Sequence, residues 1–478
     1  MLSRGVHLWP TAVVILRPTA VVISWPTAVV FLWPTAVVFG KMLYICIREK
    51  QEIMKEYRLR IVDNQLDGML RRIGAVLIQG PKWCGKTTTA EQKASSIIYL
   101  DDPGKQKIYR QTAELNIGVL LQGDTPRLMD EWQLIPQLWD AVRFEVDHRG
   151  AEGQFILTGS AVPPLTNEIN HTGTGRFARL TMRTMSLLES GDSTGSVGLR
   201  WLFEKHEEQP SGTADIDLER LSFLICRGGW PNSIGKIEED ALALAYDYYD
   251  AVVESDISRV DGIRRNAELA RRLTRSLARH QGAQVPLETI RQDMASNDES
   301  VLGESSFAQY MNALKSIFVV DDMPAWNPNL RSKTAIRTSD TRYFNDSSIA
   351  AAALGVSPAD LMQDLNTMGL MFETLAVRDL RVYADALDGR VYHYRDKSGL
   401  ECDAVVHLRN GNYGLVEIKL GGDSLIEDGA KTLKSLAEKI DTDKMKSPSF
   451  LMVLTGVGEY PLRRHDGVYV VPIGCLGV

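Results

Sequence analysis

Short apolar runs alternate with helical spacing along most of the chain. Two runs of strand length, residues 74–79 and 155–157, are each followed by small or glycine-rich residues, and the first leads into a helical stretch. This succession is typical of α/β folds with a parallel sheet. Helical patterns resume near residue 216, and strand-like runs return beyond residue 390. We therefore expect a parallel-sheet α/β domain, a helical middle module and a second α/β domain, in that order.

The first forty residues follow a different pattern. The residues Pro-Thr-Ala-Val-Val recur every eight positions from Pro10 to Pro34. A proline at that spacing interrupts helical hydrogen bonding, which argues against a membrane-spanning helix of about 20 residues. We interpret residues 1–41 as an octapeptide repeat that is not folded and has no assigned function. It is either a tandem repeat translated ahead of a true start at Met42 or Met54, or a membrane-associating segment without stable membrane insertion.

Composition and charge narrow the classes of protein. A chain of 478 residues has room for about three domains, and 44% hydrophobic with 24% charged residues is typical of a globular protein. The net charge of −7 excludes a globally basic nucleic-acid coat, but not a local basic patch. Five scattered cysteines argue against a disulfide framework and favour a reducing, cytoplasmic location. We place the three domains at residues 55–190, 216–330 and 340–460.

A phosphate-binding loop follows the first apolar run. The residues Gly80-Pro-Lys-Trp-Cys-Gly85-Lys86-Thr87 fit the pattern G-x-x-x-x-G-K-[ST]. The glycines let backbone N–H groups turn towards phosphate oxygens, and the next helix adds the positive end of its dipole. Lys86 is expected to reach the β- and γ-phosphates, and the Thr87 hydroxyl to bind Mg²⁺. The motif predicts ATP and Mg²⁺ as cofactors. The predicted nucleotide-binding residues are Gly80, Pro81, Lys82, Trp83, Cys84, Gly85, Lys86, Thr87, Thr88 and Ser160.

An acidic pair further along the chain is the candidate for metal and water binding. Asp130 would hold Mg²⁺ through water, and Glu131 would orient or deprotonate the attacking water. The alternative is a surface pair of acids that opens a helix, where acids suit the helix dipole. Because a P-loop precedes it, we favour the catalytic interpretation.

Two later segments extend this predicted site. The run 155–157 ends in Thr158 and Ser160, and either is a candidate γ-phosphate sensor, because ligands lie at the carboxyl ends of parallel strands. The alternative is a strand that simply enters a turn. A glycine-rich loop then carries Arg176, either an arginine finger acting in cis or from a neighbouring subunit, or a surface charge. The predicted catalytic residues are Lys86, Glu131 and Arg176.

Taken in order, these motifs resemble a large prokaryotic family of AAA-type P-loop ATPases fused to a C-terminal domain of unknown function. The resemblance covers roughly residues 55–440 and implies ATP binding and hydrolysis. The N-terminal repeat departs from the family. The motifs that carry the resemblance are the P-loop, Asp130-Glu-Trp-Gln133, Phe155-Ile-Leu-Thr-Gly-Ser160, Gly175-Arg-Phe, Cys226-Arg-Gly-Gly-Trp-Pro231, Asp256-Ile-Ser258, Pro324-Ala-Trp326, Leu330-Arg-Ser-Lys333 and Phe372-Glu373.

The middle module contains a basic amphipathic helix. On a helical wheel of residues 264–279, six arginines fall on one side and leucines on the other. Residues 286–293 and 305–316 then have helix-turn-helix spacing, and 317–320 reads as a wing strand. DNA is therefore a candidate partner. The alternatives are a solvated arginine face and a helical module that only packs between two domains. The six arginines are Arg264, Arg265, Arg271, Arg272, Arg275 and Arg279.

The last domain carries a nuclease-like signature. Strand-like runs at 400–406 and 413–419, joined by an Asn-Gly turn, place Asp403, Glu417 and Lys419 in the pattern D-x₁₃-E-x-K. Two carboxylates can hold Mg²⁺, while a lysine beside them orients water and stabilises phosphate charge. This resembles the PD-(D/E)xK nuclease core, to whose first helix Glu373 would correspond. The alternatives are a hairpin with ordinary ion pairs, and a nuclease-like fold that binds without cleaving.

The combined prediction is an ATP-binding protein with Mg²⁺-dependent ATPase activity, whose nucleotide state controls a C-terminal module that acts on or binds DNA. The alternative is a nucleotide-switched protein-binding module without nuclease activity. The expected partners are ATP or ADP, DNA and, through AAA-type sites shared between subunits, further copies of the chain.

Overall fold

The computed structural model describes residues 57–160, 173–204, 208–295, 302–328 and 339–478, together with the backbone of three strands near the N-terminus. The chain divides into two units, Met1–Arg58 and Leu59–Val478, each described by itself. Within the described residues, no helix is long and apolar enough to cross a membrane.

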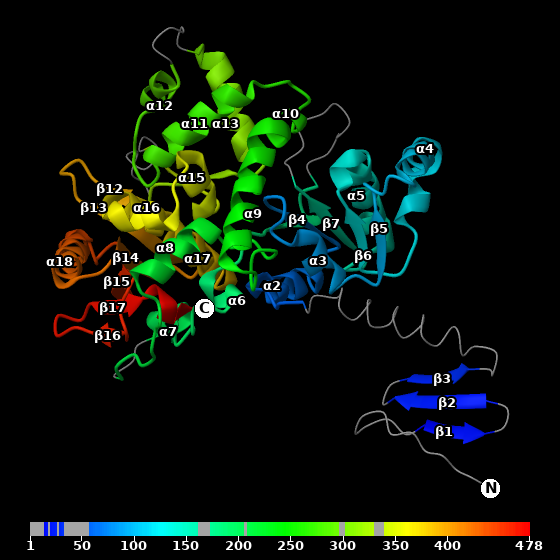
Figure 1. Cartoon of the computed structure of the whole chain (residues 1–478), viewed down its shortest axis with the longest axis horizontal. Helices are drawn as coiled ribbons and strands as arrows, with labels where there is room; N and C mark the ends of the chain where they lie inside the picture. Colours follow the sequence, from blue (N-terminus) through cyan, green and yellow to red (C-terminus); the bar gives the residue numbers. More distant parts are fainter. Residues whose placement is uncertain are drawn as a thin grey trace. The chain divides into compact units, whose positions relative to one another are not determined.

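The N-terminal unit contains a three-stranded antiparallel sheet (Figure 1). Its strands are β1 (Val14–Arg17), β2 (Ala20–Trp25) and β3 (Ala28–Leu32). The expectation that residues 1–41 are unfolded is corrected for these segments. Their valine-rich sequences have high β-propensity, and the repeated prolines, which cannot donate to a ladder, lie outside the strands. The rest of the repeat lies outside the described residues.

The second unit begins with a five-stranded parallel sheet in the order β5-β6-β7-β4-β8, as the alternation of strand and helix predicts. One core cluster packs α2 and α3 against the sheet, and a second packs α5. The elements are α2 (Ile61–Leu70), β4 (Ala75–Gln79), α3 (Lys86–Glu91), β5 (Ser96–Tyr99), α4 (Gln106–Asn116), β6 (Arg127–Asp130), α5 (Leu138–Arg149), β7 (Phe155–Gly159) and β8 (Phe177–Thr181).

The middle part is helical and ends in a two-stranded antiparallel ribbon, β10–β11. Two of its helices, α12 and α13, lie where the helix-turn-helix spacing predicts them, α11 begins at Ala267 within the predicted basic helix 264–279, and the wing strand begins at Val320, at the end of the expected 317–320. The elements are α8 (Leu218–Arg227), α9 (Glu238–Ala251), a π-helical turn (Val252–Asp256), α10 (Ile257–Arg259), α11 (Ala267–Arg279), α12 (Leu287–Asp293), α13 (Glu304–Ser316), β10 (Val320–Met323), β11 (Thr341–Phe344), α15 (Ser347–Leu354) and α16 (Pro358–Gln363).

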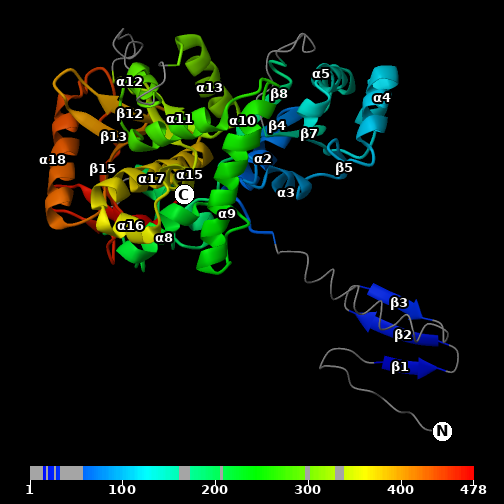
Figure 2. The ribbon, with the colours of Figure 1, turned by 45° about the horizontal axis from the view of Figure 1, so that its top comes forward.

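A second, mixed sheet in the order β12-β13-β14-β15-β17-β16 closes the chain. It lies between α17 and α18 in both views (Figures 1 and 2), and each helix packs on a separate apolar cluster of the sheet. The elements are α17 (Leu365–Ala386), β12 (Gly389–Arg395), β13 (Glu401–Leu408), β14 (Tyr413–Lys419), α18 (Asp423–Lys439), β15 (Phe450–Thr455), β16 (Leu462–Arg463) and β17 (Tyr469–Pro472).

The segment after the first sheet joins the parts of this unit. It contains α6 (Leu187–Ser190), β9 (Val197–Gly198) and α7 (Leu199–Phe203), and β9 pairs in parallel with β18 (Leu476–Gly477). The largest apolar core runs through this segment, the middle helices and the last sheet. The middle module and the C-terminal domain therefore share this core, and the C-terminal sheet has a second cluster beneath α18.

Candidate functional site

The loop between β4 and α3 is shaped by two glycines and a buried lysine. Gly80 has φ of 154°, and a Cβ there would lie 2.0 Å from the backbone oxygen of Met182, so only glycine fits. Gly85 has φ of 100° and directly precedes α3. The Nζ atom of buried Lys86 donates to the carbonyl oxygens of Gly80 (3.0 Å) and Pro81 (2.7 Å). The loop thus wraps around an ammonium group at the carboxyl end of β4, an inner strand of the sheet.

Oxygen atoms from three elements meet beside this loop. The Thr87 hydroxyl, on α3, donates to Asp130 Oδ1 at 2.7 Å, and the Thr158 hydroxyl, on β7, donates to the same oxygen at 2.5 Å. The backbone N–H of Glu131 donates to Thr158 Oγ1 at 3.3 Å. Hydroxyl and carboxylate oxygens are ligands that Mg²⁺ prefers, so Thr87 and Asp130 fit the predicted metal site. Thr158 holds the acidic pair in place.

Glu131 has the environment of a proton acceptor. Its carboxylate accepts hydrogen bonds from Ser160 Oγ at 3.1 Å and from the Gln133 side chain. Burial raises the pKa of Glu131, the Asp130 charge raises it further, and the nearby Lys86 opposes both. A raised pKa brings a carboxylate closer to the operating pH, which suits general-base catalysis.

A cavity of about 920 Å³ lies over the loop. Gly80, Pro81 and Cys84 do not line it, and the buried Cys84 thiol points instead to the Met182 carbonyl oxygen at 3.6 Å. The predicted residues that line the cavity are Lys82, Trp83, Gly85, Lys86, Thr87, Thr88, Glu131 and Ser160.

The opposite wall of the cavity comes from the middle helices, and sequence reasoning assigned it no role. Asp256, in the π-helical turn, forms an ion pair with Lys82 at 2.6 Å, and Arg259 of α10 also lines the cavity. Trp83 packs against Tyr248 with ring centroids 5.8 Å apart. The motif Asp256-Ile-Ser258 was visible in the sequence, but nothing local indicated that it faces the P-loop.

Arg176 lies at the other end of the parallel sheet. Its carbonyl oxygen accepts from the N–H of Ala75, the first residue of β4, whereas the P-loop follows the last residue of that strand. The Arg176 guanidinium pairs with Asp147 at 2.7 Å, at the end of α5. The prediction of an arginine finger in cis is wrong, because a strand length of about 16 Å separates the two ends. Action from a neighbouring subunit stays a prediction.

A second cluster of charged residues forms where α17 meets the last sheet. Lys419 Nζ lies 3.1 Å from Asp403 Oδ2 and 2.6 Å from Glu417 Oε2. Glu373 of α17 accepts a hydrogen bond from the Tyr343 hydroxyl at 2.5 Å. Burial raises the pKa values of both Glu373 and Glu417 to about 8, and the charge of Asp403 adds to each shift. The structure therefore brings together the four residues of the nuclease-like signature.

A β-bulge orients one member of this cluster. The register between β12 and β13 shifts between Tyr392 and Tyr394, next to Asp403. Asp403 Oδ2 then accepts the N–H of Ile418 at 2.7 Å. Among the described residues, no three side chains of His, Cys, Asp or Glu converge closely enough to hold a metal ion. Here Lys419 occupies the space between two carboxylates, so the predicted metal role of Asp403 and Glu417 requires that the lysine move.

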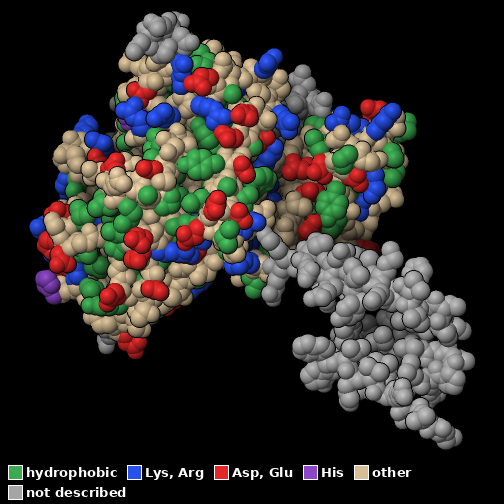
Figure 3. Space-filling view, viewed as in Figure 1, with side chains coloured by type: hydrophobic (Ala, Val, Ile, Leu, Met, Phe, Trp, Pro, Cys, Tyr) green, Lys and Arg blue, Asp and Glu red, His purple; other side chains and the backbone are tan. Residues whose placement is uncertain are grey.

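The arginine stripe of the middle module is largely neutralised. Arg271 pairs with Asp250 (2.7 Å) and Glu254 (2.8 Å), and buried Arg265 pairs with Asp261. Figure 3 shows Lys and Arg side chains interleaved with Asp and Glu over this part of the surface. Acids of the preceding helix and turn lie against this face and weaken the case for DNA contact through it, while Arg264 and Arg275 remain exposed.

The parallel sheet and its loop give the first domain the architecture of a P-loop nucleotide-binding domain. Residues 73–190 match the family described as AAA domain. Residues 218–360 and 368–476 match two families described as Domain of unknown function, DUF8612 and DUF4143.

Three individual proteins are similar to this chain. Uncharacterized proteins of Mycobacterium bovis and Mycobacterium tuberculosis are each 23% identical over 352 residues, which cover 73% of this chain and 71% of the relative. A Walker-type ATPase of Pyrococcus abyssi has 11% sequence identity and a TM-score of 0.38, covering 61% of this chain and 94% of that one. At that TM-score, the assignment of the class does not rest on the archaeal structure.

Proposed function

We propose that this protein is a Mg²⁺-dependent ATPase whose nucleotide state controls its C-terminal α/β domain. The observation that carries the proposal is that Lys86, Thr87 and Glu131 line one cavity, with Asp130 hydrogen-bonded to Thr87. The match of residues 73–190 to the AAA domain family supports it.

The chain's own residues supply positioning and charge in this mechanism. Lys86 exchanges the carbonyls of Gly80 and Pro81 for phosphate oxygens, and the loop N–H groups bind the phosphates at the N-terminus of α3. Glu131 orients a water molecule and accepts its proton, held by Ser160 and Gln133. When bound by Thr87 and Asp130, Mg²⁺ neutralises phosphate charge.

Calorimetry with ATP tests the nucleotide site. Lys86→Ala should lower ATP affinity at least tenfold, because it removes the one buried cation of the loop. Lys93→Ala is the matched control, since Lys93 follows α3 and pairs with Asp67 instead. Wild-type protein that takes up neither ATP nor ADP, or unchanged uptake by Lys86→Ala, would refute the proposal.

A chain of polar contacts supports communication between the two α/β parts. Arg60, at the start of α2, donates to the P-loop carbonyl of Cys84 at 2.8 Å and pairs with Glu189 of α6 at 3.0 Å. In the same segment, the Leu187 N–H donates to Asp379 of α17 at 2.9 Å. The loop therefore reaches, through α6, the helix that carries Glu373.

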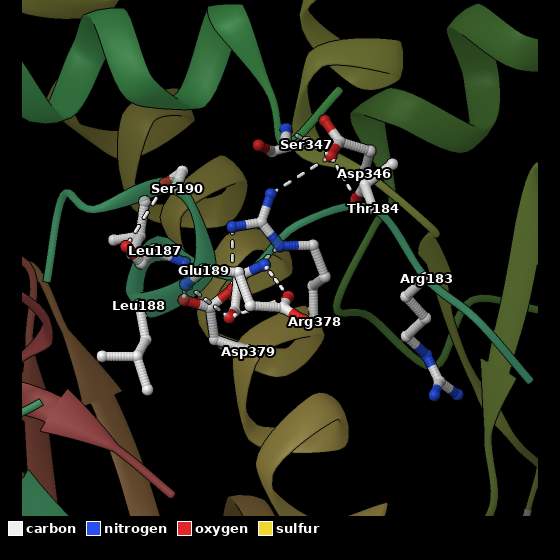
Figure 4. A network of polar contacts seen from close by, with 12 residues as sticks. Arg183, Thr184, Leu187, Leu188, Glu189, Ser190, Asp346, Ser347, Arg378 and Asp379 are labelled. Carbon is white, nitrogen blue, oxygen red and sulfur yellow. Dashed lines mark hydrogen bonds and ion pairs between the residues drawn. The ribbon is translucent and has the colours of Figure 1, made fainter. Parts of the chain in front are cut away.

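The far end of this chain of contacts is a buried ion cluster (Figure 4). Arg378 lies between Asp379 (2.7 Å) and Asp346 (3.1 Å), and Asp346 also accepts from the Thr184 hydroxyl at 2.6 Å. Such paired buried charges favour one arrangement of the surrounding elements. Limited proteolysis tests the coupling: the cleavage pattern should differ between an ATP analogue, ADP and no nucleotide, and identical patterns would refute it.

A second candidate function is metal-dependent phosphodiester cleavage by the C-terminal domain. The contacts of Lys419 with Asp403 and Glu417, beside buried Glu373, favour it over a plain ion-paired hairpin. Labelled DNA incubated with Mg²⁺ or Mn²⁺ tests it, and cleavage should be lost in Asp403→Ala and in Lys419→Ala. Absence of cleavage by the wild-type protein would leave the alternative, a nucleotide-switched binding module.

A further inference from the structure

A second large cleft, separate from the P-loop cavity, lies between the first sheet and the last one. Its volume is about 940 Å³, and it is lined by parts of α2, β8, α7, β10, α17, β12 and β13. Neither the P-loop residues nor Asp403, Glu417 and Lys419 line it. The cleft is therefore a candidate site of its own.

The cleft is strongly basic, although the chain as a whole is acidic. Seven arginines line it against four aspartates, and two of the aspartates, Asp321 and Asp385, already bind Arg183 at 3.0 and 2.7 Å. Arg381 pairs with Asp321 as well, at 2.9 Å. These inner pairs form a neutralised floor to the cleft.

The outer arginines are different. Arg72, Arg200, Arg390 and Arg409 are exposed, and none forms an ion pair with a carboxylate in the part of the chain that the structure describes, whereas the Arg179 guanidinium lies over the Trp139 ring. They come from four separate segments of the chain. Like charges gathered without counterions repel one another, and an anionic ligand relieves that repulsion.

The residue types indicate which anion would bind. The seven cations are all arginine, whose planar guanidinium binds phosphate through paired hydrogen bonds and stacks on flat rings. Tyr392 and His407 line the same cleft as half-buried rings, with centroids 6.4 Å apart. Burial lowers the pKa of His407, which favours an uncharged ring near neutral pH. Proteins that bind single-stranded nucleic acid place arginines on the phosphate backbone of the strand and stack aromatic rings on its bases.

We propose that this cleft binds a single-stranded nucleic acid, with Arg390 and Arg409 on its phosphates and Tyr392 against a base. The inference deepens the proposed function, because it gives the C-terminal module a binding surface. It does not require ATP hydrolysis, since its ligand site shares no residue with the P-loop cavity.

Fluorescence anisotropy of the full chain with a labelled oligothymidine, without nucleotide, tests the proposal. The double variant Arg390→Gln/Arg409→Gln should bind roughly tenfold more weakly at low salt, and its salt dependence should lose a slope of about 1.4, at ~0.7 per phosphate contact. The matched control is Lys107→Gln/Arg110→Gln, which removes the same charge from exposed residues of α4 outside the cleft and should bind like wild type.

Four outcomes would overturn the proposal. They are no binding by the wild-type protein, unchanged binding by the cleft variant, an equal loss in the control variant, and binding of inorganic polyphosphate but not of the oligonucleotide. The variant Tyr392→Leu tests the stacking role, and it should weaken binding of the single strand. Wild-type protein that binds a labelled duplex as tightly as the single strand would contradict that role. Lys86→Ala should retain oligonucleotide binding, so a failed ATPase assay and a failed cleft remain distinguishable.

Discussion

The P-loop site and the cluster around Lys419 both place a lysine near acids at strand ends, yet they neutralise that lysine differently. Lys86 donates to two backbone carbonyls, and hydroxyls hold the adjacent acid Asp130. Lys419 lies instead within 3.1 Å of Asp403 and 2.6 Å of Glu417. The charge of Lys86 thus remains available for a phosphate, whereas that of Lys419 is already balanced inside the protein.

This difference separates a prepared site from a closed one. At the P-loop, an anionic ligand replaces weak carbonyl contacts, so binding needs little rearrangement. At the second cluster, a metal ion must first displace an ammonium from two carboxylates, which costs the ion pairs. We therefore expect nucleotide chemistry at the first site to survive changes at the second.

The largest effect should come from Glu131→Gln. ATP turnover should fall by a factor of about 10²–10⁴, the usual contribution of a general base, while ATP binding stays within a fewfold of wild type. Glu417→Gln should leave turnover unchanged. Steady-state ATPase assays beside calorimetry measure both. Equal losses in the two variants would mean that the sites are not separate.

The second largest effect should come from the buried ion cluster that lies between the two sites. Arg378→Ala removes the cation between Asp346 and Asp379, and leaves two buried carboxylates without it. We expect a loss of about 3–5 kcal/mol in the free energy of unfolding, measured by urea denaturation. The exposed Arg390→Ala should change it by less than about 0.5 kcal/mol. A small loss of unfolding free energy in Arg378→Ala would show that this ion cluster does not stabilise the packing between the first α/β part and the C-terminal part.

Measuring stability as a function of pH should show the raised pKa of Glu417 at the Lys419 cluster. Glu417 has a pKa of about 8 in the folded protein against an ordinary value of 4.5, so between these values the folded state binds more protons than the unfolded state. Its contribution to stability is present below pH 4.5 and is lost as pH rises to about 8.

The free energy of unfolding of Glu417→Gln should therefore exceed that of wild type at pH 8–9 by at least ~1.4 kcal/mol, which corresponds to a shift of one pKa unit. At pH 4–5 the two proteins should differ little in stability. Thermal melts across this range measure the gap. A gap that is independent of pH would contradict the raised pKa.

The smallest effect should come from the other lysine of the loop. Lys82 is partly exposed, so the loss of its pair with Asp256 in Lys82→Ala should change stability by less than about 1 kcal/mol. ATP affinity should change less than in Lys86→Ala, because Lys82 forms no contact inside the loop. Calorimetry on the two variants side by side checks this order, and a larger loss in Lys82→Ala would reverse it.

The prediction of β4, β7 and the nucleotide loop between β4 and α3 needed only local sequence, whereas β5 and β8 of the same sheet were not predicted. Gly80, Gly85, Lys86 and Thr87 lie within one short segment, and a strand, a turn and a helix start follow from residue types within about ten positions. The acidic pair Asp130-Glu131 was predictable because short parallel strands end at a shared edge. The D-x₁₃-E-x-K spacing was also visible, although a bulge that no spacing reveals orients Asp403.

Tertiary structure alone decided the remaining features. The sequence indicated an arginine stripe, but acids 17 and 21 residues away neutralise Arg271. One sequence interpretation made Arg176 an arginine finger in cis, although the direction of β8 carries it to the opposite end of the sheet. Asp256 lies against Lys82, 174 residues distant in sequence. Short-range patterns specify strands and turns through local backbone preference, whereas the net charge of a surface depends on which distant segments the packed core brings beside it.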